Sequence, residues 1–139
     1  MTPEQKTLVQ QTFAQVVPIA EQAAALFYGR LFQLDPSLRP LFKSDLGAQG
    51  KKLMQMIGYC VGKLDSLDEL VPAVKDLGRK HAGYGVEAAA YQTVGAALLW
   101  TLEQGLGAAF TPEVKSAWTE VYGILSATML EGAQALPAA

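Results

Sequence analysis

The chain has 139 residues, 50% of them hydrophobic and 17% charged, which is enough for one domain with a buried core and excludes a disordered chain. The formal net charge is −2, and tight basic pairs occur only at 51–52 and 79–80, which argues against a nucleic-acid partner. The N-terminus has no apolar leader pattern, no apolar stretch is long enough to span a bilayer, and one cysteine cannot form an internal disulfide. We therefore expect a single cytoplasmic domain over residues 1–139.

Helix-forming residues dominate the whole chain, and runs of β-branched residues are absent. The cap, proline and acid of Thr2-Pro3-Glu4 predict the start of a first helix. Pro18 predicts a boundary before a second helix that runs to about Leu34. Asp35 then begins a short helical turn that ends at "RPLF" (39–42).

The same start and stop signals divide the rest of the chain. Further helices are predicted at 47–62, from Ser66 or Asp68 to the glycines at 83–85, at 87–104 with Gly105 and Gly107 as its stop, and at 112–134. About seven helices and no strand predict an all-α domain, with helices packed at oblique angles rather than as a four-helix bundle.

His81 is the only histidine of the chain and ends an apolar helix face. Leu70, Val74 and Leu77 precede it at steps of four, three and four residues, so the four side chains share that face. A lone histidine in such a place is more often a core or half-exposed residue than a ligand. Its surroundings must therefore carry any functional assignment.

Three other features stand out before His81. The stretch "LFYGRLF" (26–32) places Tyr28 among apolar residues, where a buried phenol needs a partner. Phe42 follows a short helical turn, a position from which an aromatic ring can wedge against a flat ligand. Gln49 and Leu53 lie one helical turn apart on the same face.

Taken in order and at their spacing, several motifs of the chain resemble the globin family. The closest resemblance is to the single-domain bacterial haemoglobins of the Vitreoscilla type and to the globin domain of flavohaemoglobins, and it spans nearly the whole chain. It is carried by "LFYGRLF", "RPLF", "VPAVKDLGRKHAGYGV" (71–86), "AAAYQTVG" (88–95) and "AWTEVYGI" (117–124).

The resemblance implies a globin fold around a haem pocket, with His81 as the proximal ligand of haem b (iron protoporphyrin IX). The ring nitrogen that does not bind iron would donate to a main-chain carbonyl one turn earlier, near Leu77 or Gly78. Covalent attachment is excluded because the chain has no C-x-x-C-H pattern. With no second histidine, the sixth iron position is open to a gas or to a weaker internal ligand.

On the opposite side of the haem, the resemblance puts Tyr28 and Gln49 in place of a distal histidine, as the candidate catalytic residues. Both side chains can donate to O2, and such bonds contribute about 1.5–3 kcal/mol each. Two alternatives stay open. Tyr28 can be a core tyrosine bonded to a helix carbonyl, and Gln49 can face solvent.

The resemblance also implies a set of residues that contact the cofactor, namely Phe42, Leu53, Leu77, Lys80, Val86, Tyr91 and Val94. For Lys80, as for Lys52, a solvated surface lysine is the alternative to a propionate contact. In flavohaemoglobins a tyrosine and a glutamate polarise the proximal histidine. Tyr91 matches the tyrosine, but Ala133 occupies the glutamate position, and Glu131 lies about 200° away around an ideal helix.

The function implied is binding of O2, NO and CO, with NO dioxygenation as the predicted reaction. The 139 residues leave no room for a flavin or nicotinamide domain, so turnover would need an external reductase. The alternative is O2 binding, storage or delivery without turnover, and a sensor role is a weaker rival. A monomer and a homodimer are both open. The pattern Gly83-x-Gly85-x-x-Ala88 is rejected as a dinucleotide site because a helix, not a strand, precedes it.

Overall fold

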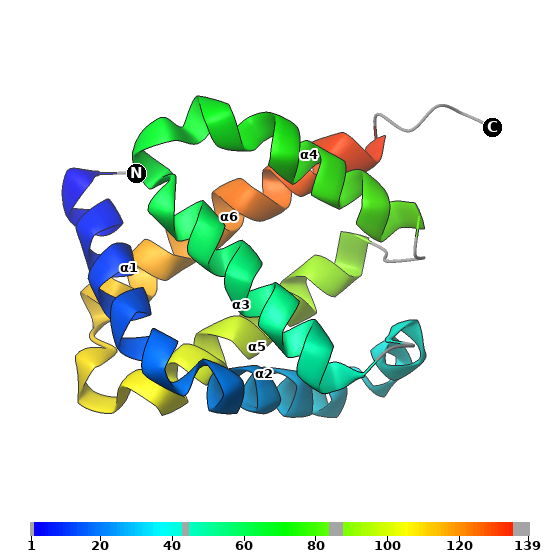
Figure 1. Ribbon diagram of the computed structural model, residues 1–139, viewed down its shortest axis with the longest axis horizontal. Helices are drawn as coiled ribbons and strands as arrows, with labels where there is room; N and C mark the ends of the chain where they lie inside the picture. The colour runs from blue at the N-terminus through cyan, green and yellow to red at the C-terminus, as the bar shows by residue number, and fades with distance from the viewer. Residues whose placement is uncertain (1, 43–44, 84–87, 135–139) are drawn as a thin grey trace.

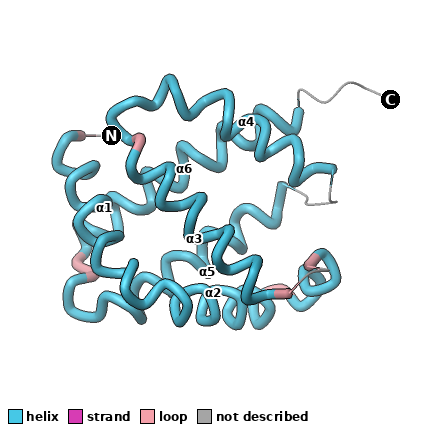
Figure 2. The backbone as a smooth tube through the Cα atoms, in the orientation of Figure 1, coloured by secondary structure: helices cyan, strands magenta, loops and turns pink. Residues whose placement is uncertain are grey.

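A computed structural model describes residues 2–42, 45–83 and 88–134. These residues are helical almost throughout, and only short connections interrupt the helices (Figure 2). The predicted all-α class is therefore confirmed. In chain order the helices are α1 (Pro3–Val16), η1 (Val17–Ile19), α2 (Ala20–Leu34), η2 (Pro36–Leu41), α3 (Leu46–Gly62), η3 (Leu64–Ser66), α4 (Leu67–Gly83), α5 (Ala88–Leu106), η4 (Gly107–Ala109) and α6 (Pro112–Gln134), where η marks a 3₁₀-helix.

Side-chain caps explain where several helices begin. Thr2 and Gln5 form a reciprocal capping box at the start of α1, with Pro3 in the first turn. Asp35 accepts a hydrogen bond from the Ser37 N–H at the start of η2. Thr111 accepts from the Val114 N–H at the start of α6, at 3.2 Å. The polar signals in the sequence therefore mark real helix starts.

Two predicted boundaries were wrong, and a third is decided between its two alternatives. Helix α3 begins at Leu46 rather than Gly47, because Asp45 caps it by accepting from the Ala48 N–H. Helix α4 begins at Leu67, directly after Ser66, so the alternative cap Asp68 lies in its first turn. At the other end of α5, Gly105 remains helical. The stop comes at Gly107, whose φ of 56° is a conformation that favours glycine.

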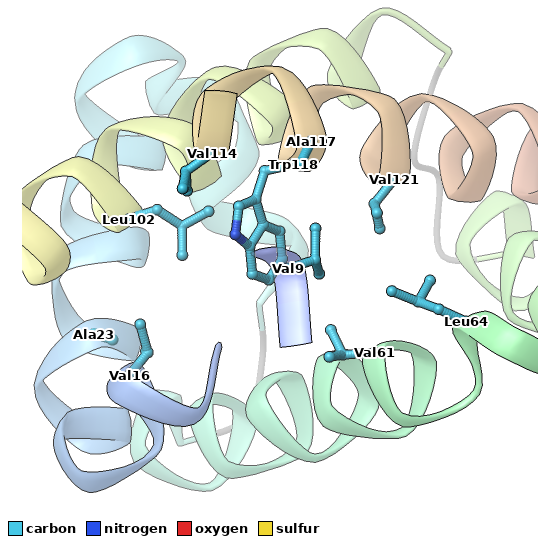
Figure 3. Packing of buried hydrophobic residues seen from close by; sticks show 10 residues of the cluster. All are labelled: Val9, Val16, Ala23, Val61, Leu64, Leu102, Val114, Ala117, Trp118 and Val121. Carbon is cyan, nitrogen blue, oxygen red and sulfur yellow. The ribbon is translucent and has the colours of Figure 1, made fainter. Parts of the chain in front are cut away.

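The main hydrophobic core surrounds Trp118 of α6. Figure 3 shows its indole at the centre of apolar side chains from α1, α2, α3, α5 and α6. The indole N–H donates to the Thr12 hydroxyl at 2.9 Å, and Thr12 in turn donates to the Leu8 carbonyl at 2.6 Å. Each of these buried polar groups has a hydrogen-bond partner, so their burial in the core leaves no donor unsatisfied.

The helices cross at oblique angles (Figure 1), and side chains from α1, α2, α3, α5 and α6 meet at this core. Helix α2 packs against α3 and α5, whereas α4 packs mainly against α6. Among the described residues, no helix combines the length and apolar character that crossing a membrane requires.

Candidate functional site

His81 lies in the last turn of α4 and is half-buried. Its Nδ1 is 2.8 Å from the main-chain oxygen of Leu77, which is one of the two acceptors expected from the sequence. A carbonyl oxygen only accepts hydrogen bonds, so Nδ1 carries the proton. In the neutral imidazole, Nε2 then keeps a free lone pair. This tautomer and ring orientation suit Nε2 for binding a metal ion.

His81 lines an apolar cavity of about 180 Å³ between α3, α4, α5 and α6. The other lining residues are Phe27, Leu53, Met56, Ile57, Cys60, Val61, Val74, Leu77, Tyr91, Val94, Leu98, Trp118, Val121, Tyr122, Leu125, Ser126 and Met129. Burial raises the pKa of the Cys60 thiol, so Cys60 contributes to this wall as a neutral side chain. The cavity thus presents one imidazole in largely apolar surroundings.

Four of the predicted cofactor contacts lie on this cavity with His81: Leu53, Leu77, Tyr91 and Val94. Lys80 does not line the cavity. It is exposed, and its Nζ lies 3.2 Å from a carboxylate oxygen of Asp76. Val86 falls outside the described residues.

Phe42 packs against the aromatic residues of α2 instead of lining the cavity. Its ring centroid lies 5.3 Å from that of Tyr28 and 5.4 Å from that of Phe32, both edge to face. Tyr28 also meets the ring of Phe27 at 5.1 Å. Phe27 itself lines the cavity, so this aromatic cluster adjoins its α2 side.

Tyr28 and Gln49 are brought together at the crossing of α2 and α3. The phenol oxygen lies 3.5 Å from the Gln49 main-chain oxygen, at the long limit of a hydrogen bond. Burial raises the pKa of Tyr28 to about 12, and a hydrogen bond with the Gln49 side chain lowers that pKa in part. The phenol therefore stays protonated at neutral pH and remains a donor. Neither residue lines the cavity, but each adjoins a residue that does: Phe27 precedes Tyr28, and Leu53 lies one turn after Gln49.

Gly50 makes this approach of α2 and α3 possible. A Cβ on Gly50 would lie 2.8 Å from the Cβ of Ala24 and 4.0 Å from the ring of Tyr28. Since carbon atoms in contact are normally about 3.5–4.0 Å apart, only glycine fits without moving a helix.

We expect Gly50→Ala to lower the free energy of unfolding by about 1–3 kcal/mol, the usual cost of overpacking. Urea unfolding followed by circular dichroism measures the change. Gly62→Ala, at the end of α3, is the matched control because a Cβ there meets nothing within 4 Å. Equal stabilities of the two variants would contradict the account of this crossing.

Tyr91 is buried, and its hydroxyl has no hydrogen-bond partner among the described residues. Tyr122 of α6 instead donates its hydroxyl proton to the Tyr91 main-chain oxygen. Glu131, two positions from the residue that matches the flavohaemoglobin glutamate, lies 3.8 Å from Lys75 of α4. The unpartnered Tyr91 hydroxyl is consistent with the expected absence of a glutamate at position 133, where the chain has alanine.

The α6 side of the cavity was only partly anticipated from the sequence. Trp118 and Tyr122 lie within the motif "AWTEVYGI" (117–124), whereas Leu125, Ser126 and Met129 lie outside it and were not singled out. Together with Val121 these residues recur at steps of three and four, one face of a helix. That periodicity marks a buried face but does not indicate that the face borders a cavity.

Comparisons with known proteins agree with this arrangement. The globin family model matches residues 25–129. Three neuroglobins resemble the chain: those of Chaenocephalus aceratus at 34% identity, Tetraodon nigroviridis at 33% and Danio rerio at 32%. Each alignment extends over 121 residues and covers 77% of this chain and 76% of the relative. The resemblance to the bacterial subgroup stays a prediction.

Proposed function

The chain belongs to the globin family, and on this premise we propose that it binds haem b through His81 and takes up O2 reversibly. Membership of this family implies haem-based gas binding. One observation carries the proposal: His81 lines an apolar cavity, and the hydrogen bond from Nδ1 to Leu77 leaves Nε2 free as a ligand.

The residues around the cavity fit haem as a cofactor. Bound haem supplies an iron with one coordination position for His81 and another for a diatomic gas. Leu53, Leu77 and Val94 provide apolar walls for a flat macrocycle and exclude water from it. The unpartnered hydroxyl of Tyr91 is a buried donor on the same cavity, to which a polar edge of a bound molecule can supply an acceptor.

Tyr28 and Gln49 are proposed to determine how tightly O2 is held. The support is their contact with each other, the protonated phenol, and their position beside the cavity-lining Phe27 and Leu53. Each hydrogen bond that these two side chains donate to a partly negative ligand would stabilise it by about 1.5–3 kcal/mol. Such a site favours retention of O2 over rapid delivery.

NO dioxygenation is a second candidate function, and the same pair of donors favours it. Strong retention keeps O2 at the site until NO arrives. The net reaction joins NO, O2 and one electron into nitrate, so repeated turnover requires an electron donor of the one-electron reductase class. On this proposal Tyr28 and Gln49 would hold O2 in place during the reaction.

One experiment separates the two functions. The haem-loaded protein is first cycled between air and argon, and its absorption spectrum is followed. Reversible binding predicts full recovery of the O2-bound spectrum, and immediate oxidation with no recovery would contradict it. NO is then supplied with O2, a one-electron flavoprotein reductase and its reduced nicotinamide. Catalytic nitrate formation that falls in Tyr28→Phe supports dioxygenation, whereas no nitrate beyond one turnover leaves reversible binding as the function.

A further inference from the structure

Helices α4 and α6 cross at a point where each helix has a glycine, Gly78 on α4 and Gly132 on α6. A Cβ on Gly78 would lie 2.6 Å from the Cα of Met129, with the Met129 carbonyl oxygen still closer. A Cβ on Gly132 would lie 2.7 Å from the Cα of Lys75, again with the carbonyl oxygen closer. Carbon atoms in contact are normally about 3.5–4.0 Å apart. The two main chains therefore touch at this crossing, and any larger residue would have to separate the helices by roughly 1 Å.

The contacts are reciprocal, so they set the register of the two helices. Lys75 and Gly78 lie one turn apart on α4, and they contact Gly132 and Met129, which lie one turn apart on α6. An ion pair of 3.8 Å between Lys75 and Glu131 flanks the crossing. Leu70, Val74 and Met129 pack around it, with Cys60, Leu67 and Leu125.

This crossing lies one helical turn from His81. His81 lines the same cavity as Leu125, Ser126 and Met129 of α6. The hydrogen-bond acceptor of His81 is the main-chain oxygen of Leu77, the residue next to Gly78. The stretch of α4 that orients the imidazole is thus the stretch held against α6. Figure 1 shows the last turns of α6, in orange and red, meeting α4, in green.

We propose that Gly78 and Gly132 are positioning residues for His81, because their close contact fixes the main chain that holds its imidazole. A Cβ at position 132 presses on Lys75, two residues before the carbonyl that accepts from Nδ1. A shift of about 1 Å there changes the direction of that hydrogen bond and the position of Nε2. Displacements of this size at a reacting centre alter rates by up to about 100-fold. The effect on gas binding rests on the proposed function, whereas the effect on the imidazole does not.

The chain offers a matched pair of variants on α6. Gly132→Ala adds a methyl group at the crossing, and Gly123→Ala adds the same group where nothing lies within 4 Å. Because His81 is the only histidine, a chain labelled with ¹⁵N-histidine gives one pair of imidazole signals. Recorded on the haem-free full chain, the wild type is expected to show protonated Nδ1 and unprotonated Nε2. We expect Gly132→Ala to lose this single tautomer and Gly123→Ala to keep it. Identical spectra for all three proteins would overturn the proposal.

Haem-loaded protein provides the second readout. Gly132→Ala is expected to shift the iron–histidine stretching band of the reduced protein and to change the CO association rate by about 10-fold, with Gly123→Ala within about 2-fold of wild type. A purely structural role would lower stability without moving this band, and an unmoved band overturns the proposal. If no variant takes up haem, the proposed function fails while the imidazole spectra still decide the positioning role.

Should Gly132→Ala fail to fold, hydrogen exchange on the wild-type chain replaces it. Helices held main chain to main chain are expected to open together, so the amides at 78–82 should exchange as slowly as those at 125–132. Exchange at 78–82 that is about 100-fold faster, while 125–132 stays protected, would show that the crossing does not hold this part of α4.

Discussion

Replacing His81 with alanine is expected to lower the affinity for haem by at least about 100-fold. The estimate is a lower bound, since removing a group that only orients a metal ligand already costs about 10–100-fold. Among the residues lining the cavity, His81 supplies the one imidazole, and the lining residues beside it on α4, Val74 and Leu77, carry no metal-binding group. Haem titration of the haem-free wild-type and variant chains, followed by absorption, measures the difference.

Imidazole added to His81→Ala provides the control for misfolding. Because the substitution leaves a space of imidazole size beside Leu77, free imidazole is expected to restore much of the ferrous-CO spectrum. A variant that binds haem with wild-type affinity and spectrum, without added imidazole, would show that His81 is not the ligand.

Tyr28→Phe is expected to speed the release of O2 from the haem-loaded protein by about 10–100-fold. The substitution removes one hydroxyl, and losing a hydrogen bond of about 1.4–2.8 kcal/mol corresponds to that range. The ring contacts with Phe27, Phe32 and Phe42 involve no hydroxyl, so packing is retained. Stopped-flow displacement of O2 by CO gives the rate.

Tyr59→Phe is the matched control for this measurement. Tyr59 lies on α3 and is 46% exposed, so the same chemical change there is expected to leave the release rate unchanged. Equal rates for wild type, Tyr28→Phe and Tyr59→Phe would show that the Tyr28 phenol does not hold O2. The alternative of a core tyrosine bonded to the Gln49 carbonyl would then stand.

The helix boundaries set by local chemistry could largely be predicted from the sequence. Thr2, Asp35 and Thr111 cap helices through bonds to residues two or three positions away, so a short stretch of sequence contains both partners. Gly105 was misjudged as a stop because glycine alone does not end a helix. The left-handed conformation that does so occurs two residues later, at Gly107.

Within the candidate site, too, the geometry set by residues close in sequence could be predicted, whereas the geometry set by the packing of separate helices could not. The hydrogen bond from His81 to Leu77 joins residues four apart on one helix, so its geometry follows from the sequence. The close approach of Gly50 to Ala24 and that of Gly78 to Met129 depend instead on how separate helices pack. A single sequence does not encode those partners in any local pattern. For the same reason, the residues of α6 that border the cavity were recognised only as a buried face.

Haem titration of the haem-free wild-type chain is the most direct test of the central claim that His81 and its cavity hold haem for gas binding. The account predicts saturation at one haem per chain and, after reduction and addition of CO, the spectrum of a ferrous-CO haem with a histidine ligand. A chain that remains colourless, or that takes up haem weakly and without a defined CO spectrum, would contradict it.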